Sequence, residues 1–463
     1  MRALPFSSAR ASLLSRKSGG DDFLASAAQR GTWVKLSGNL RADLLLGLSL
    51  RGLGALSSFA LIWMISQIFG ADVLGLYQLG VTGVALLALF GLLGNDVLLV
   101  RDIGAKIKSG LLADARAQFS SARKFVWMLS AGAAAILAIF AFPFSEYVIG
   151  EPRLTRYLLL LAPAVLLLAS LRLTNSFLRT NGSVLASQTL EGVFYTTLAT
   201  ALLALVWWSG WAVPEWFLIL AYGGSLALAA GLSLMLARRL AISWPEGGIA
   251  KLKPRAGAVI AAAQSPTSIT QWLVLLIITM VISVADSGIY RTAFQFCMLF
   301  QLVATSFNMM AGPHLSRAVA GSDGADVHKT VRMTGLIGLS LCAVPALIVL
   351  FAAEWLLQLF GAEFTIATQA LQILVVAQLI NVAFGPAGGA LIMLQRERLV
   401  LWIEICASMP ALALTWFLLP HYGITAAAIG VLAETIIRKL SQFVLLRRQI
   451  KQLNQSGWDG LES

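Results

Sequence analysis

The chain has 463 residues, of which 58% are hydrophobic and 12% are charged, and its formal net charge is +12. So few charges exclude an ordinary soluble domain, where about a quarter of the residues are charged. Apolar runs such as 44–69 and 399–419 are long enough to cross a hydrocarbon core of about 30 Å as helices. They are too long and too uniformly apolar for barrel strands. The sequence therefore predicts a polytopic helical membrane protein.

Hydropathy along the chain predicts about twelve membrane-spanning helices. They fall near residues 44–69, 73–98, 125–149, 157–178, 186–209, 214–237, 257–284, 291–313, 333–353, 366–393, 399–419 and 422–446. The predicted order is a flexible cytosolic tail, a six-helix N-lobe, a cytosolic linker, a six-helix C-lobe and a cytosolic tail, at 1–43, 44–237, 238–256, 257–446 and 447–463. The first 40 residues contain no apolar core of a signal peptide.

The positive charges predict the orientation. With the N-terminus in the cytoplasm, 29 of the 34 Lys and Arg residues fall in the inner segments. Three fall outside, namely Arg153, Arg156 and Arg291, and two fall inside spans. The positive-inside rule then places both termini in the cytoplasm. The net charge is accordingly interpreted as a set of topology determinants beside anionic lipid, and we expect no nucleic-acid partner.

The two halves of the chain resemble each other. Gly75-Leu76-Tyr77 opens the second span after Asp72, and Gly288-Ile289-Tyr290 opens the eighth span after Asp286, about 213 residues later. Two six-helix repeats that enter from the same side are related by an axis along the membrane normal, with a cavity between the lobes. Chance similarity between hydrophobic segments is the alternative interpretation.

The sequence shows no motif typical of a catalytic or metal-binding site. Cys297, Cys342 and Cys406 lie singly in different spans, which predicts neither a disulfide framework nor a metal site. The predicted loops are short and carry no glycine-rich phosphate loop or paired carboxylates. We therefore expect no catalytic residues, no metal and no cofactor, and we expect any site to lie within the helical bundle.

Ionisable groups inside a membrane are costly and are therefore candidates for function. Arg51 lies about 10 Å into the first span, where it would face a wet cavity or extend back to the headgroups. Arg291 opens the eighth span, where it meets an anionic substrate or anchors the helix end. Asn308 and Gln271 are polar residues of the predicted C-lobe, which also holds Arg291. Together with the two arginines they form the predicted substrate-binding set.

Three acids are candidates for ion coupling or for structural pairing. Asp96 lies near the inner end of the second span, and Glu191 and Glu404 occupy matching positions in the two repeats. A further acid, Glu434, precedes Arg438 by four residues, a spacing that pairs side chains on one helix face.

Several segments resemble the Wzx-type polysaccharide flippases of the multidrug/oligosaccharidyl-lipid/polysaccharide (MOP) exporter superfamily. The resemblance covers about residues 40–450 and rests on the segments 68–77 (IFGADVLGLY), 288–293 (GIYRTA) and 359–364 (LFGAEF). Trp272 precedes the second of these at a similar distance. The acidic residue often found two positions after this tryptophan in the family is Val274 here.

The resemblance implies a MATE-like fold of two six-helix bundles that open alternately to each side of the bacterial inner membrane. The implied substrate is an undecaprenyl-diphosphate-linked oligosaccharide for O-antigen or exopolysaccharide synthesis, with the diphosphate held by a cavity arginine such as Arg51. H⁺ or Na⁺ would couple transport, and a polysaccharide polymerase and a chain-length regulator are implied partners, with membrane lipids around the helices. The alternatives are a cation-coupled drug exporter of the same superfamily and a membrane enzyme or scaffold that acts on lipid-linked sugars.

Overall fold

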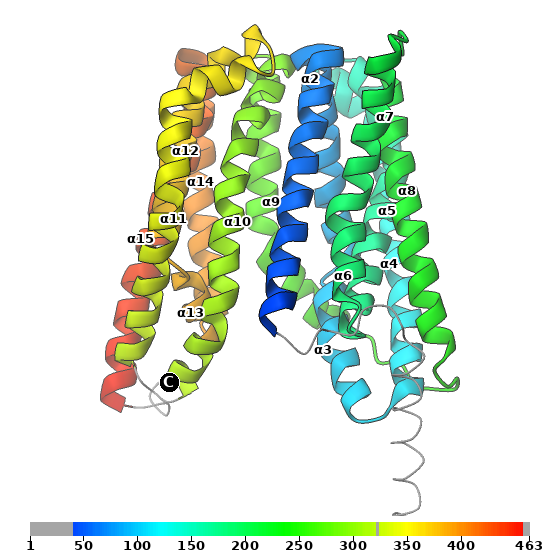
Figure 1. The fold of residues 1–463 in the computed structure, drawn as a ribbon, viewed down its shortest axis with the longest axis vertical. Helices are drawn as coiled ribbons and strands as arrows, with labels where there is room; N and C mark the ends of the chain where they lie inside the picture. Colours follow the sequence, from blue (N-terminus) through cyan, green and yellow to red (C-terminus); the bar gives the residue numbers. More distant parts are fainter. Residues whose placement is uncertain (1–39, 321–323, 457–463) are drawn as a thin grey trace, which may run out of the picture.

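The computed structural model describes residues 40–320 and 324–456, and this part of the chain is almost entirely helical (Figure 1). Element labels follow Figure 1. In chain order the elements are α2 (Leu40–Leu92), α3 (Asn95–Lys108), α4 (Leu112–Pro143), η1 (Phe144–Ile149), α5 (Arg153–Thr180), α6 (Val184–Gln188), η2 (Thr189–Phe194), α7 (Tyr195–Ser209), α8 (Trp216–Ile242), α9 (Pro254–Val281), α10 (Val284–Ala320), α11 (Gly324–Gln358), η3 (Ala362–Ala367), α12 (Thr368–Ala383), α13 (Ala387–Met393), α14 (Glu397–Tyr422) and α15 (Ile424–Ser456).

The first helix, α2, is too long for one crossing of a membrane. Its 53 residues would extend about 80 Å if straight. Gly70 interrupts it with φ 79° and ψ −176°, a conformation open to glycine because it has no Cβ. The chain turns back at this point at the top of Figure 1. We call the two parts α2a (40–69) and α2b (71–92), and each makes one crossing.

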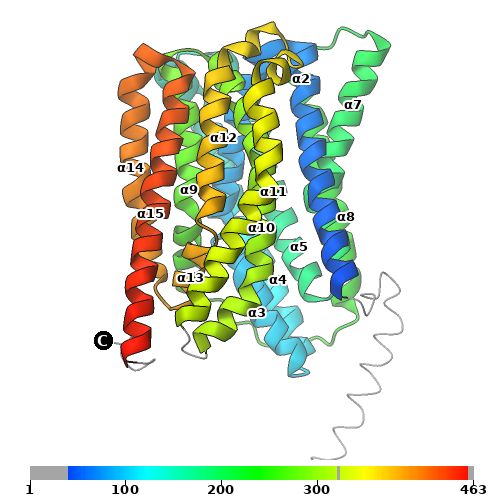
Figure 2. The same ribbon diagram turned by 60° about the vertical axis from the view of Figure 1, so that its left-hand side comes forward.

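Nine helices of the described residues are long and apolar enough to cross a membrane. One of them, α2, makes two crossings. Helices α10 and α15, with 37 and 33 residues, run alongside the others over the same height (Figure 2) but carry charged side chains such as Arg291 and Arg438. The described residues therefore make twelve crossings, and the prediction of about twelve transmembrane helices is confirmed.

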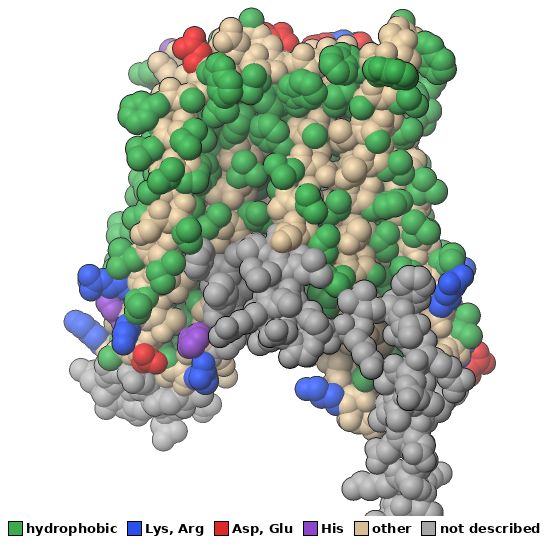
Figure 3. Space-filling view, in the orientation of Figure 1, with side chains coloured by type: hydrophobic (Ala, Val, Ile, Leu, Met, Phe, Trp, Pro, Cys, Tyr) green, Lys and Arg blue, Asp and Glu red, His purple; other side chains and the backbone are tan. Residues whose placement is uncertain are grey.

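The crossings form two bundles, as predicted. Helices α2–α8 form the N-lobe and α9–α15 form the C-lobe (Figure 1). The upper end holds the turns near residues 70, 150, 210, 282, 361 and 423, and the lower end holds the turns near 94, 110, 182 and 248. Acidic side chains lie along the upper rim and most basic side chains lie toward the lower end (Figure 3).

The lobes touch each other closely in the upper half. A Cβ on Gly75 of α2b would collide with the backbone carbonyl of Val284, and a Cβ on Gly288 of α10 would lie 2.5 Å from the carbonyl oxygen of Ala71. The two glycine motifs that suggested a duplication therefore pack against each other across the lobe boundary. At the lower end a notch separates the two lobes (Figure 3).

Candidate functional site

A polar cavity of about 60 Å³ lies inside the C-lobe, between α9, α10, α12 and α15. That volume admits water or a small ionic group. Its walls mix amides, hydroxyls and charges with a few apolar side chains. The lining residues are Thr267, Thr270, Gln271, Val274, Leu275, Tyr290, Arg291, Phe294, Gln301, Gln378, Asn381, Val431, Glu434, Thr435 and Arg438.

One wall of the cavity comes from a broken helix. Helix α12 ends at Ala383, Gly385 has φ 60°, and α13 begins after Pro386. Proline cannot donate a backbone hydrogen bond and glycine tolerates positive φ, so the sequence ends the helix here. Just before the break, Asn381 Nδ2 donates to Gln378 Oε1 at 3.3 Å. Interrupted helices with polar side chains at membrane depth are typical of binding sites in transporters.

Charged residues of α15 form the next wall, and α14 packs behind them. Arg438 Nη1 lies 3.3 Å from Glu404 Oε2 and 3.9 Å from Glu434 Oε1. Gln442 Nε2 donates to the other oxygen of Glu404 at 3.2 Å, and Ser408 lies 3.5 Å from Glu434. The spacing of Glu434 and Arg438 on one helix face is thus realised, although Glu404 is the closer partner of the arginine.

Arg291 enters the cavity from α10 in a different way. Its guanidinium carbon lies 5.2 Å from the centre of the Phe294 ring, which is within cation–π range. Within the described residues, the Nε atoms of Arg291 and Arg438 are buried and have no hydrogen-bond partner. A buried donor without a partner costs about 1–3 kcal/mol, and more when the group is charged. Such a cost is offset when a bound ligand supplies the missing acceptor.

A second chamber of about 30 Å³ adjoins the first through Asn381, which lines both. Lys439 of α15 lines this second chamber together with Thr334 and Gly385. The lysine lies within electrostatic reach of Arg438 and Glu404. None of the other residues that line this second chamber is an acid.

The balance of charge in the two chambers is positive. The cations Arg291, Arg438 and Lys439 line the two chambers together with the carboxylate Glu434, and Glu404 of α14 pairs with Arg438. One positive charge is left over when every group is ionised. An uncompensated buried charge is expensive, so this arrangement favours an anionic ligand.

The structure brings only part of the predicted substrate-binding set together. Gln271 and Arg291 both line the first chamber. Arg51 lies on α2a in the other lobe, and its side chain is exposed rather than part of the C-lobe cavity. Asn308 lies in α10, but its side chain falls outside the described part of the chain.

The three predicted acids lie in three different settings. Glu404 pairs with Arg438 at the cavity, whereas Glu191 pairs with Arg179 at 2.9 Å inside the N-lobe. Asp96 lies in the first turn of α3, where the helix dipole stabilises a carboxylate, and its buried Oδ1 has no hydrogen-bond partner in the described residues.

The sequence repeat does not extend to the chemistry of the cavity. In the N-lobe, Tyr77 packs against Tyr222 with ring centroids 5.6 Å apart, and Tyr195 packs against Tyr222 at 6.0 Å. In the C-lobe, Tyr290 lies at the corresponding place in the similar motif and lines the polar cavity together with Glu434. Aromatic rings thus pack around the N-lobe tyrosine, while the C-lobe tyrosine borders a polar cavity.

Sequence reasoning missed Lys439. It counted this residue among the inner charges that set topology, although the residue lies inside the twelfth span as predicted from hydropathy. Its position one residue after Arg438, within a span that also holds Glu434, was an available signal, because three charges in one crossing need polar surroundings.

The sequence matches no protein-family model and no curated protein. Solved structures do match over most of the chain. The inward-facing conformation of a multidrug resistance MATE family transporter of the MOP superfamily matches with a TM-score of 0.67 and 14% identity, over 89% of this chain and 99% of that chain. A MOP superfamily transporter from Pyrococcus furiosus, described as having a binding pocket of reverse polarity, matches with a TM-score of 0.60 and 15% identity, over 89% and 94%.

A mutant of a MATE transporter from Vibrio cholerae matches with a TM-score of 0.54 and 14% identity, over 90% of this chain and 100% of that chain. At this level of identity the similarity shows the fold. The chain is a multi-pass membrane protein with the fold of MOP superfamily transporters, which confirms the predicted fold class.

Proposed function

We propose that this protein is a flippase that moves undecaprenyl-diphosphate-linked oligosaccharide units across the bacterial inner membrane for cell-surface or exopolysaccharide synthesis. The observation that carries the proposal is the excess positive charge in the C-lobe chambers, where buried Arg291 and Arg438 nitrogens lack partners. A diphosphate supplies several acceptor oxygens and negative charge at once. The polyprenyl chain stays in lipid while the polar headgroup moves between the lobes.

A departure from the polysaccharide flippases leaves the seventh span without the family's candidate acid for ion coupling, and this departure favours an anionic ligand in the cavity. Val274 stands where the family often carries an acid, and in this chain it lines the first chamber. A carboxylate there would cancel the excess positive charge of the cavity. Its replacement by an apolar side chain leaves Arg291 and its neighbours able to attract a phosphate group.

Arg51 remains the proposed first contact for the diphosphate. It lies in the lower half of α2a, on the lobe opposite the chambers. In this proposal Arg51 takes up the headgroup from the lower end before the headgroup reaches the C-lobe cavity.

The proposed orientation places the lower end and both termini in the cytoplasm. The excess of Lys and Arg in segments that connect at the lower end supports it. The closed upper half and the notched lower end then correspond to a state open to the cytoplasm. The similarity to a transporter described as inward-facing agrees with this assignment.

Transport in this proposal is rocking of two lobes, 44–237 and 257–446, about the linker 238–256. The chain acts as a secondary transporter and leaves its substrate chemically unchanged. An H⁺ or Na⁺ gradient, or consumption of the product by a polysaccharide polymerase and its chain-length regulator, supplies the energy. Asp96, Glu191 and Glu404 are the proposed coupling acids.

The test uses purified protein in proteoliposomes with fluorescent substrates of matched tail length. We expect faster transbilayer movement of a polyprenyl-diphosphate oligosaccharide than of a neutral polyprenyl glycoside, with the diphosphate bond intact. Equal rates for the two would refute the anion-selective flippase. Cleavage or extension of the glycan would favour an enzyme acting on lipid-linked sugars, and binding without movement would favour a scaffold.

A cation-coupled drug exporter is the second candidate. Glu404 and Glu434 favour it, because carboxylates at membrane depth also attract cations, and multidrug transporters share the fold. In the same vesicles this candidate predicts gradient-driven export of a cationic dye and no effect on the lipid-linked sugar.

A further inference from the structure

Two turns of similar sequence meet at the upper end of the lobe boundary. The segment 69–72 (FGAD) connects α2a to α2b, and the segment 360–363 (FGAE) connects α11 to η3. Both use a glycine with positive φ, 79° at Gly70 and 138° at Gly361. The carboxylate oxygen Oε1 of Glu363 accepts a hydrogen bond from the backbone nitrogen of Ala71 at 2.9 Å. Glu363 of the second turn therefore binds the backbone of the first turn.

This hydrogen bond is a helix cap supplied from the opposite lobe. Ala71 begins α2b, and the first backbone N–H groups of a helix have no partner within it. A residue just before the helix usually provides the acceptor, but Gly70 has no side chain. Glu363, which lies 292 positions away in the chain, takes this place. Its negative charge also lies favourably at the positive end of the helix dipole.

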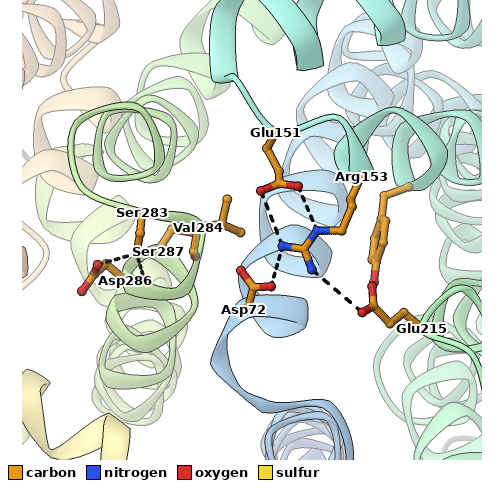
Figure 4. A network of polar contacts seen from close by, with 9 residues as sticks. Asp72, Glu151, Arg153, Glu215, Ser283, Val284, Asp286 and Ser287 are labelled. Atoms are coloured by element: carbon orange, nitrogen blue, oxygen red, sulfur yellow. Dashed lines mark hydrogen bonds and ion pairs between the residues drawn. The ribbon is translucent and has the colours of Figure 1, made fainter.

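The repeat counterpart of this helix end is capped differently. At the start of α10, Asp286 N donates to Ser283 Oγ at 3.1 Å, and the Ser283 hydroxyl donates back to the Asp286 carboxylate (Figure 4). The backbone N–H of Asp286 at this end of α10 thus finds its acceptor in the same stretch of chain. Of the two equivalent helix starts, only that of α2b takes its cap from the other lobe.

Further hydrogen bonds cross the boundary to the same turn. Trp63 Nε1 donates to the carbonyl oxygen of Leu359 at 2.9 Å. Gln67 Nε2 donates to the carbonyl oxygens of Leu359 and Phe360 at 3.1 and 3.2 Å. All these donors lie on α2, and all the acceptors lie between residues 359 and 363.

The α2 side of the contact is held firmly by its own lobe. Arg153 of α5 binds Asp72, the residue after Ala71, with Nη2 and Oδ2 2.6 Å apart. The same guanidinium binds Glu151 at 2.8 Å and lies 3.9 Å from Glu215 (Figure 4). The turn is therefore fixed to the N-lobe, so a separation of the lobes breaks the bond to Glu363 rather than bending the turn.

We propose that Glu363 is the positioning residue that closes the upper gate, by capping α2b only when the two lobes meet at that end. The inference rests on the alternating movement of the lobes in the proposed function. When the lobes part at the upper end, α2b loses its cap and the state open at that end becomes less stable. Removal of the cap should shift the equilibrium between the two states about 5- to 30-fold toward opening at the upper end.

The test measures exposure of the boundary without any substrate. Ser287 is 1% exposed and lies beside Gly288 in the closed boundary, so a Ser287→Cys reporter reads opening there. The exposed Cys406 is first replaced by Ser, and labelling uses a water-soluble maleimide on the full chain in vesicles. Glu363→Ala should raise the labelling rate about 5- to 30-fold, and Glu363→Gln, which keeps an acceptor oxygen, should raise it less.

The matched control is Glu354→Ala, which removes an exposed acid at the same end of α11. It should leave the labelling rate unchanged. A wild-type rate in Glu363→Ala, or an equal increase in Glu354→Ala, would overturn the proposal. Thermal unfolding of each variant in detergent identifies any loss of fold. Because no substrate is present, failure of the gate is distinguishable from failure of the flippase proposal.

Discussion

Two arginines of the C-lobe cavity differ in what surrounds them. Arg438 lies near both Glu404 and Glu434, so its charge is already compensated. Among the described residues, no carboxylate lies within ion-pair distance of Arg291, whose guanidinium lies over the ring of Phe294. Loss of Arg438 would leave two acids unpaired and harm the fold, whereas loss of Arg291 removes charge that the fold does not use.

The ion pairs of the upper end predict a dependence of stability on pH. The Arg153 guanidinium, through its hydrogen bond, holds the pKa of the Glu151 carboxyl below its ordinary value of about 4.3. A lowered pKa in the folded protein adds stability that is present at neutral pH. This contribution is lost as the pH falls from about 4.3 through the lower folded value. We expect Glu151→Gln to lower the melting temperature at pH 7 and to have little effect at pH 3.

The control is Glu146→Gln, which changes an exposed acid of η1 for which no ion pair is present within the described residues. It should leave the melting temperature nearly unchanged at both pH values. The effect of Glu151→Gln should be small, because exposed ion pairs contribute only about 0–1 kcal/mol. A loss of stability in Glu151→Gln that is as large at pH 3 as at pH 7 would contradict the ion-pair explanation.

Part of the candidate site could be predicted residue by residue. Gln271 and Arg291 were identified because polar groups are costly inside a membrane, and both line the cavity. Their convergence with Lys439 and Asn381 could not be predicted. These residues lie on α9, α10, α12 and α15, and hydropathy gives no information on which helices are neighbours or which faces they share.

At the scale of whole elements, glycine controls how closely the lobes approach. Gly75 of α2b lies against the backbone of Val284, where no Cβ has room. We expect Gly75→Ala to force α2b and α10 apart and to destabilise the closed form by about 1–3 kcal/mol. Thermal unfolding of the purified protein in detergent measures this loss.

Gly223→Ala on α8 is the matched control, because a Cβ there meets nothing within 4 Å. Alanine favours a helix over glycine by about 0.5–1 kcal/mol, so this variant should be slightly more stable than the native chain. Equal effects of the two substitutions would show that close packing at Gly75 is not what joins the lobes.

The interruptions of the helices were only partly visible in the sequence. Gly385-Pro386 falls inside the tenth predicted span, 366–393, and the structure ends α12 just before it. The kink at Gly70 was placed between two spans, although the backbone runs on through a single turn. Local sequence predicts such breaks because they depend on the chemistry of one or two residues.

At the scale of the molecule, the two lobes share a plan but differ in the side chains around their tyrosine motifs. The twelve crossings and two bundles could be predicted, because they follow from hydropathy and from the repeated glycine motifs. The difference between the two tyrosine motifs could not, since an aromatic cluster around Tyr77 and a polar cavity beside Tyr290 satisfy the same pattern of apolar spans. In the proposed function the C-lobe holds the ligand and the N-lobe moves against it.

The measurement that tests this account most directly compares Arg291 variants in the flipping assay with the diphosphate-linked oligosaccharide. Arg291→Ala should reduce the rate at least about tenfold, since a charged hydrogen bond contributes about 1.5–3 kcal/mol. Arg291→Lys should retain part of the rate as a point charge without the planar fork. Arg332→Ala, an exposed arginine of α11, should flip at the native rate. A native rate in stably folded Arg291→Ala would contradict the assignment of the C-lobe cavity as the diphosphate site.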